Sequence, residues 1–115
     1  MRRFETLADL AEKHGLKLIV AIMTGHMTFR QFVPPALDGR DIFRDPIALK
    51  WEARFLAYFV SRMKQHPAIF AWESGNESNY MSHARIPEEG WVWIKYIHGI
   101  IRENDNSRPV IGVSG

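Results

Sequence analysis

The chain has 115 residues, with 15 Lys and Arg against 13 Asp and Glu, five His and no Cys. Hydrophobic residues make up 46% and charged residues 24%, which is the balance of an ordinary globular domain and excludes a disordered or collagen-like chain. The net charge of +2 is scattered and forms no basic stripe, which argues against nucleic acid as a partner, and the lack of Cys excludes disulfides, thiolate metal sites and a Cys nucleophile.

The sequence predicts neither a membrane span nor a signal peptide. The longest wholly apolar run, Leu18 to Met23, is far shorter than the roughly 18 residues that a span requires. We therefore expect no membrane partner. Localisation stays open, because proteins without Cys occur in every compartment.

Three elements are predicted in the first 44 residues. Apolar residues at helical spacing predict a helix over residues 4–14, and Gly15 can end it in the left-handed conformation. Residues 16–23 are mostly apolar with almost no alternation, which predicts a central strand buried on both faces of a parallel sheet. Residues 24–44 contain adjacent prolines and no sustained period, so we predict a long loop of a kind that is often functional.

The next helix has the strongest pattern. Asp45 is a natural N-cap and Pro46 suits the first turn, so a helix is predicted from there to about Gln65. Five apolar residues at helical spacing are expected to face the core: Trp51, Phe55, Tyr58, Phe59 and Met63.

Two further strands and one helix complete the prediction. His66 and Pro67 break the helix, and an apolar strand is predicted over residues 68–72, followed by the polar stretch 73–80. Proline and two acids open a third helix over residues 87–103. A last strand is predicted over residues 109–113.

The order α, β, α, β, α, β predicts an α/β fold with right-handed βαβ units and a parallel sheet, either open or closed into a barrel. The chain starts almost directly with a helix and stops within a few residues of a strand. Because a complete eight-stranded barrel takes about 250 residues, we expect residues 1–115 to form a single fragment of a larger domain.

Polar residues follow two of the predicted strands, where parallel α/β folds carry their functional groups. His26 follows the first strand, and Glu73, Asn76, Glu77 and Tyr80 follow the second. A Glu can exchange a proton with a substrate oxygen while a neighbouring Asn amide binds an adjacent hydroxyl. Without a family, the residues by themselves favour a plain polar loop after a strand over a catalytic pair.

Residues 66–77, HPAIFAWESGNE, resemble the fourth strand of clan A glycoside hydrolases, where a hydrophobic strand ends in Asn-Glu. The cellulases and β-mannanases of family five are the most similar. Three further segments agree with that family: residues 25–27, 39–46 and 105–110.

The resemblance covers essentially the whole chain, from the second helix to the fifth strand of a (β/α)8 barrel. It implies retaining hydrolysis of a β-linked oligo- or polysaccharide, with Glu77 as general acid/base and Asn76 as the partner of the sugar 2-hydroxyl. It also implies that His26 lines the substrate cleft. No cofactor or metal is implied.

Aromatic residues near the motif are candidate sugar contacts. Tyr80 could stack on a sugar ring, or it could be an ordinary loop residue. Trp72 stands either inside the barrel, where it would contact substrate, or outward under the helices. The remaining His residues lack the spacing of a metal site and are expected to be structural or solvated.

The nucleophile of the resembled family follows the seventh strand, which this chain lacks. Glu73 is a poor substitute, because an extended chain would separate it from Glu77 by roughly 13 Å, whereas a retaining pair lies about 5–5.5 Å apart. We expect the chain alone to be inactive.

Two other functions stay open. A truncated or split non-catalytic chain would act by assembling with a partner chain, or with itself, through its open sheet edges. A small flavodoxin-like binding module would need a phosphate loop after the first strand, which the sequence does not provide.

Overall fold

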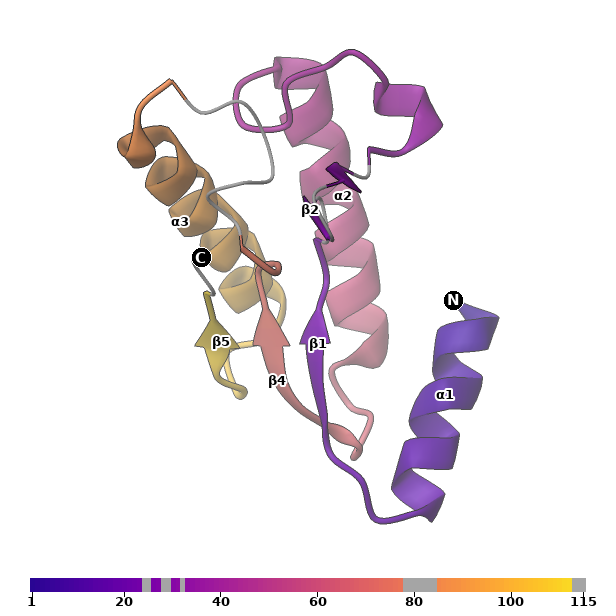
Figure 1. Cartoon of the computed structure of the whole chain (residues 1–115). Helices are drawn as coiled ribbons and strands as arrows, with labels where there is room; N and C mark the ends of the chain where they lie inside the picture. Colours follow the sequence, from indigo (N-terminus) through magenta and orange to yellow (C-terminus); the bar gives the residue numbers. More distant parts are fainter. Residues whose placement is uncertain (24–25, 28–29, 32, 78–84, 113–115) are drawn as a thin grey trace.

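A three-stranded parallel sheet organises the chain, with two long helices behind it in the view of Figure 1. This computed structural model describes residues 1–23, 26–27, 30–31, 33–77 and 85–112. The elements are α1 (Arg2–Lys13), β1 (Leu18–Ala21), β2 (His26–Met27), β3 (Arg30–Gln31), a 3-10 helix η1 (Pro35–Leu37), α2 (Pro46–Met63), β4 (Ile69–Glu73), α3 (Pro87–Asn104) and β5 (Val110–Ile111). The predicted α/β fold with a parallel sheet is confirmed, and the loop predicted over residues 24–44 contains the short antiparallel pair β2–β3.

The strand order is β1-β4-β5, so β4 is the middle strand and β1 lies at an edge of this sheet. Within the described residues β1 has one neighbouring strand, β4, and the prediction of a central first strand buried on both faces stays a prediction for the complete sheet. Val20 is buried against the helices, whereas its neighbours Ile19 and Ala21 are exposed on the opposite face. That face is open because no described element covers it.

The register of the sheet decides which face each side chain of β4 occupies. Trp72 pairs with Val20 of β1, and Glu73 pairs with Ala21. Because paired residues of parallel strands share a face, Trp72 lies on the helix side and Glu73 on the open side.

Helix α2 begins as predicted and presents a different face to the core. The Asp45 carboxylate accepts hydrogen bonds from the backbone N–H groups of Ile47 and Ala48, which stabilises the helix start. Phe59 and Met63 are buried as expected, whereas three residues of the predicted apolar stripe are about half exposed: Trp51, Phe55 and Tyr58.

The error in the predicted stripe has a geometric cause. Each exposed aromatic residue comes one position before a buried residue of α2, and one position turns the side chain by about 100° around the helix. The residues that face the sheet and α3 are Ala48, Glu52, Leu56, Phe59, Val60 and Met63.

The core lies between the sheet and α2 and α3, with α1 closing one end. Phe4 of α1 packs edge-on against Phe59 of α2, at a centroid distance of 5.0 Å. The buried cluster consists of Ala8, Val20, Ile42, Phe43, Leu56, Phe59, Val60, Met63, Ile69, Trp72, Trp93, Ile94, Ile97 and Ile101. Among the described residues, no helix is long and apolar enough to cross a membrane.

Two buried carboxylates in this core have pKa values that are shifted in opposite directions. Glu52 accepts a hydrogen bond from Trp93 Nε1 at 3.0 Å through Oε2, while its Oε1 has no partner. Burial raises its pKa to about 7, and the nearby charge of Asp41 adds to the effect, while the Trp93 bond opposes it. Asp105 receives bonds from Trp72 Nε1, Arg108 Nη1 and both the N–H and hydroxyl of Ser107. Burial opposes ionisation of Asp105, but these donors outweigh it and lower its pKa to about 2.

We predict that Glu52 makes the protein less stable as the pH rises from 4.5 to about 7. Its folded pKa of about 7 exceeds the ordinary 4.5, so the folded state binds the proton more tightly and the free energy of unfolding falls between these pH values. The loss is at most about 3 kcal/mol at 1.36 kcal/mol per pKa unit. Glu52→Gln keeps the acceptor for Trp93 and should remove this decline, as measured by urea unfolding from pH 4.5 to 8. Burial also lowers the pKa of His98, so this side chain adds its own pH dependence to the stability. The quantity to compare is therefore the difference in the free energy of unfolding between the native protein and Glu52→Gln at each pH.

We also predict that Asp105→Asn lowers the free energy of unfolding by about 2–3 kcal/mol at pH 7, because a buried carboxylate with charged and neutral donors is lost. The difference should shrink as the pH falls from 3.8 to about 2, where the native carboxylate is itself protonated. The matched control is Asp38→Asn, at an exposed position, which should leave stability unchanged. Equal stability of the two variants would contradict the prediction.

Candidate active site

The carboxyl ends of β1, β4 and β5 meet at the upper edge of the sheet in Figure 1. The backbone at the end of β4 is held from both sides. Ser74, fully buried, donates its N–H to Ile111 O at 2.9 Å and accepts the N–H of Met23 at 3.2 Å. The turn that follows Ser74 therefore starts from a fixed point between the neighbouring strands.

Asn76 and Glu77 form that turn, and both are partly exposed. Glu77 has a φ of 46°, and it is the one non-glycine residue with a positive φ in the described part of the chain. This left-handed conformation costs an L residue about 1–2 kcal/mol, and such conformations cluster at functional sites. A partly exposed carboxylate beside an amide, at the carboxyl end of a parallel strand, is suited to proton transfer with a bound ligand.

Glu73 and Glu77 are not joined by an extended chain. Strand β4 ends at Glu73, and the chain then bends and turns at residues 74–77. The separation of roughly 13 Å calculated for a continued strand therefore does not describe this pair. Glu73 is partly buried, and its register places it on the open face of the sheet.

Trp72 is not a substrate-binding residue. It is fully buried between the sheet and the helices, where its ring lies 6.2 Å from that of Phe59. Its Nε1 donates to Asp105 Oδ2 at 2.8 Å. The register with Val20 turns Trp72 towards the helices, so it has no surface left for a sugar, and the prediction of a substrate contact is wrong.

The other two predicted substrate contacts are placed only in part. His26 lies in β2, beyond the carboxyl end of β1, where its backbone pairs with Gln31. Tyr80 lies outside the described residues. The roles of His26 and Tyr80 stay predictions.

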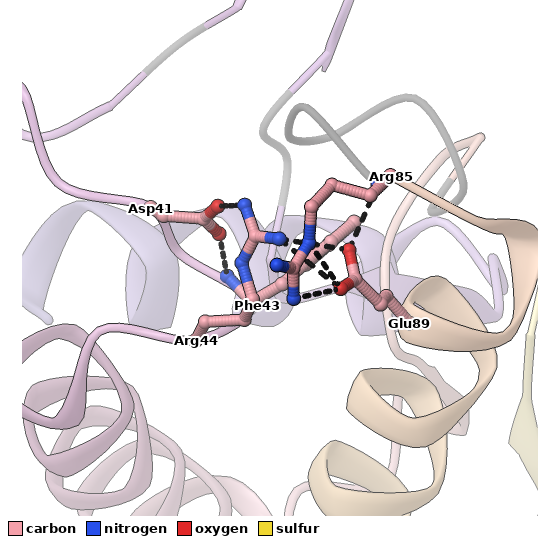
Figure 2. Close-up of polar contacts among 5 residues, drawn as sticks. All are labelled: Asp41, Phe43, Arg44, Arg85 and Glu89. Atoms are coloured by element: carbon pink, nitrogen blue, oxygen red, sulfur yellow. Dashed lines mark hydrogen bonds and ion pairs between the residues drawn. The ribbon is translucent and has the colours of Figure 1, made fainter.

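An ion-pair network that the sequence analysis missed lies at the same edge of the fold (Figure 2). Arg44, which precedes α2, reaches Glu89 in the first turn of α3 at 3.0 Å, and it also pairs with Asp41. Arg85 donates to the same Glu89 carboxylate from its backbone and its guanidinium. The bond from the backbone of Arg85, with the two guanidinium groups, lowers the pKa of Glu89.

Only half of this network had a signal in the sequence. Arg85 and Glu89 are four positions apart, which is a spacing at which side chains interact around a helix start. Glu89 had been interpreted as an acid that stabilises the first turn. Arg44 is 45 positions away, so nothing local indicated its contact with Glu89.

One group of described residues has the composition of a metal site, at the far end of the sheet. The ligand atoms of Asp9, Glu12 and His66 lie within 4.8 Å of one another. His66 Nδ1 accepts the N–H of Ala68 at 3.2 Å, and Nε2 lies 3.1 Å from Asp9 Oδ1. The Ala68 N–H occupies Nδ1, so Nε2 is the ring atom that faces Asp9.

Comparison with known proteins identifies the family. The family described as glycosyl hydrolases family 2, TIM barrel domain, matches residues 4–115. The chain belongs to this family. Its three strands and helices are therefore part of a glycoside hydrolase (β/α)8 barrel, as the resemblance predicted.

Individual relatives agree with this assignment. A probable mannan endo-1,4-beta-mannosidase A-1 of Aspergillus terreus is 31% identical over 100 residues, covering 80% of this chain. A probable mannan endo-1,4-beta-mannosidase F of Aspergillus flavus is 28% identical over 97 residues. The chain spans 25% and 21% of the lengths of these two relatives.

Solved structures show the same fold at low identity. An exo-beta-1,4-mannosidase from Opitutaceae bacterium strain TAV5 superposes with a TM-score of 0.85 at 22% identity, covering 98% of this chain and 21% of that one. GH5_18 from Streptomyces cattleya, in complex with Manb1-4GlcNAc, gives a TM-score of 0.83 at 22% identity, covering 98% and 30%.

We predict that Trp72→Phe weakens the fold and leaves ligand binding unchanged. The variant loses the bond to Asp105 and leaves a small cavity, which should lower the free energy of unfolding by about 1–3 kcal/mol. The KM of the complete barrel for a β-linked glycan should stay the same. A raised KM with unchanged stability would restore Trp72 as a sugar contact.

Proposed function

We propose that this segment supplies the general acid/base, Glu77, of a retaining glycosidase that cleaves β-linked glycans containing mannose. The observation that carries the proposal is the Asn76-Glu77 turn at the carboxyl end of β4, in which Glu77 has a left-handed backbone. The catalytic residues of (β/α)8 enzymes occupy this end of the strands. Membership of a glycoside hydrolase family and similarity to mannosidases support the choice of reaction and substrate.

In this mechanism Glu77 acts twice. Protonated, it gives its proton to the glycosidic oxygen as the leaving group departs and a covalent glycosyl-enzyme forms. Ionised, it then takes a proton from the water that hydrolyses this intermediate. Asn76 would bind the 2-hydroxyl of the sugar, a contact that strengthens in the transition state.

The nucleophile is the second carboxylate that a retaining enzyme needs, about 5–5.5 Å from the first. The resembled enzymes carry it after the seventh strand, beyond the three strands of this sheet. The matched family model is that of family 2; for the finer relationship we favour a glycoside hydrolase similar to family five, supported by the Asn-Glu motif at residues 76–77 and by structural similarity to GH5_18 enzymes. His26 and Tyr80 are proposed to line the cleft beside this turn.

A second candidate function is assembly. Ile19 and Phe70 are 55% and 56% exposed, which is high for large apolar side chains of a sheet. In a complete barrel the remaining strands would cover this face; in a non-catalytic chain a partner chain or a second copy would cover it. Light scattering tests this second function, because assembly through the open face requires a defined oligomer and a monomer contradicts it.

We predict that Glu77→Gln, made in the complete barrel, lowers kcat/KM on β-1,4-mannan by about 10²–10⁴-fold, because the amide cannot donate the proton that the leaving oxygen needs. The measurement is reducing-sugar release under initial-rate conditions. Glu88→Gln is the matched control, since Glu88 is an exposed Glu in the first turn of α3. Full activity of the Glu77 variant would refute the proposed function.

A further inference from the structure

We infer that the outer side of α2 carries a second binding site for a β-1,4-linked glycan, separate from the candidate active site. The site consists of a depression beside Tyr58 and of the aromatic stripe, formed by Trp51, Phe55 and Tyr58, that continues from it along the helix. The inference rests on the proposed function for the identity of the glycan, since the same polysaccharide would occupy the cleft and this site.

The depression lies between α1 and α2 and has a volume of about 530 Å³. This volume is within the range of pockets that hold small ligands. The residues that line it are Glu5 of α1 and Ala57, Tyr58, Ser61 and Arg62 of α2. An aromatic ring therefore lies beside a carboxylate, a guanidinium and a hydroxyl in one open depression.

These groups match the chemistry of a sugar ring. The apolar face of a pyranose can pack on the ring of Tyr58, which is 57% exposed. Sugar hydroxyls donate and accept hydrogen bonds, and a carboxylate with a guanidinium offers both roles. Arg62 Nε donates to Glu5 Oε1 at 2.7 Å, so the charges of the pair sum to zero. A lining without net charge suits a neutral glycan.

The aromatic stripe gives the site the length of a glycan chain. Its three residues lie on one side of α2, because they are spaced by four and three positions, and Trp51 is 52% exposed. Trp51 and Tyr58 are seven positions apart, which is about 10 Å along a helix and matches the length of one disaccharide unit in an extended β-1,4-linked chain. The two rings can therefore contact sugars of the same chain.

The Trp51 ring is restrained before any ligand binds. The guanidinium carbon of Arg54 lies 5.1 Å from the centre of this ring, which is the distance of a cation–π contact. A cation over one face of the indole limits its motion. Stacking of a sugar then costs less conformational entropy than stacking on an unrestrained side chain.

The helices that flank α2 in a barrel are already part of this chain. Helices of a (β/α)8 barrel form an outer ring in chain order, so the neighbours of α2 are α1 and α3. Phe4 of α1 packs against Phe59 of α2, and Trp93 of α3 donates to Glu52. The remaining strands and helices therefore add no helix between α1 and α2. The open face of the sheet differs in this respect, because the remaining strands would cover it.

The experiment measures retardation of the complete barrel in native gels that contain soluble β-1,4-mannan, and kcat/KM on an aryl β-mannoside, which is too short to reach α2 from the cleft. We expect Tyr58→Ala and Trp51→Ala each to raise the dissociation constant for mannan by about 3–10-fold, because an aromatic stacking contact is lost. Their kcat/KM on the aryl mannoside should not change. Tyr58→Phe keeps the ring and should keep the binding.

Val92→Ala is the control, because Val92 is an exposed apolar residue on α3, outside the stripe. Mannan retardation of Tyr58→Ala and Trp51→Ala equal to that of Val92→Ala overturns the inference. An equal loss on mannan and on the aryl mannoside also overturns it, because the fold has then been disturbed. A native dimer that becomes a monomer in Tyr58→Ala, as measured by light scattering, overturns it too, because the stripe would then be an interface between two copies.

Tryptophan fluorescence gives a readout without activity. A β-1,4-manno-oligosaccharide should shift the emission of the native barrel, and the shift should be smaller in Trp51→Phe. Acrylamide should quench the native barrel more than Trp51→Phe, since Trp51 is accessible to solvent. Equal shifts or equal quenching in the two proteins overturn the inference.

The two proposals can fail separately. If Glu77→Gln retains full activity on mannan, the proposed function fails, whereas weaker mannan binding by Tyr58→Ala still supports the second site. If Glu77→Gln is inactive and Tyr58→Ala binds mannan as Val92→Ala does, the second site alone is overturned.

Discussion

The register of β4 between β1 and β5 is the constraint on which the rest of the structure depends. It turns Trp72 towards the helices and Glu73 towards the open face of the sheet. A slip of one residue would exchange these faces, exposing the largest buried side chain and placing a carboxylate in the core. The same register ends the strand where Ser74 bonds to its neighbours on both sides, so the candidate catalytic turn begins at a defined point.

Polar groups inside this core are tolerated for different reasons. Trp72 brings an indole N–H into the apolar layer, and Asp105 satisfies it while holding the turn before β5. The Asp105 carboxylate has enough donors to stay ionised. Glu52 has one donor for two oxygens, so its charged form is unfavourable near neutral pH. Burial opposes ionisation of both carboxylates; the donors of Asp105 outweigh it, whereas the single bond to Glu52 does not.

The upper edge of the sheet combines these elements into a candidate active site. The strand supplies the position of Glu77, and an ion pair between Arg44 and Glu89 joins the segment before α2 to the first turn of α3. Glu89 lies in the first turn of α3, where a carboxylate is favoured, and two arginines from separate segments donate to it. Rigid elements thus position a residue that is itself on a loop, as in other (β/α)8 enzymes.

The sequence alone determined the order of helices and strands, the parallel sheet and the Asn76-Glu77 motif at a strand end, because hydrophobic period, Pro and Gly positions and helix caps are local signals. The barrel and the glycosidase family followed from a resemblance, which the comparisons support. The sequence left Trp72 ambiguous and assigned Trp51 to the core, since the direction of a side chain depends on the neighbours that its element meets. It also gave no sign of the contact between Arg44 and Glu89. Only the tertiary structure decided these points, because side-chain facing and ion pairs across 45 positions are set by packing between elements.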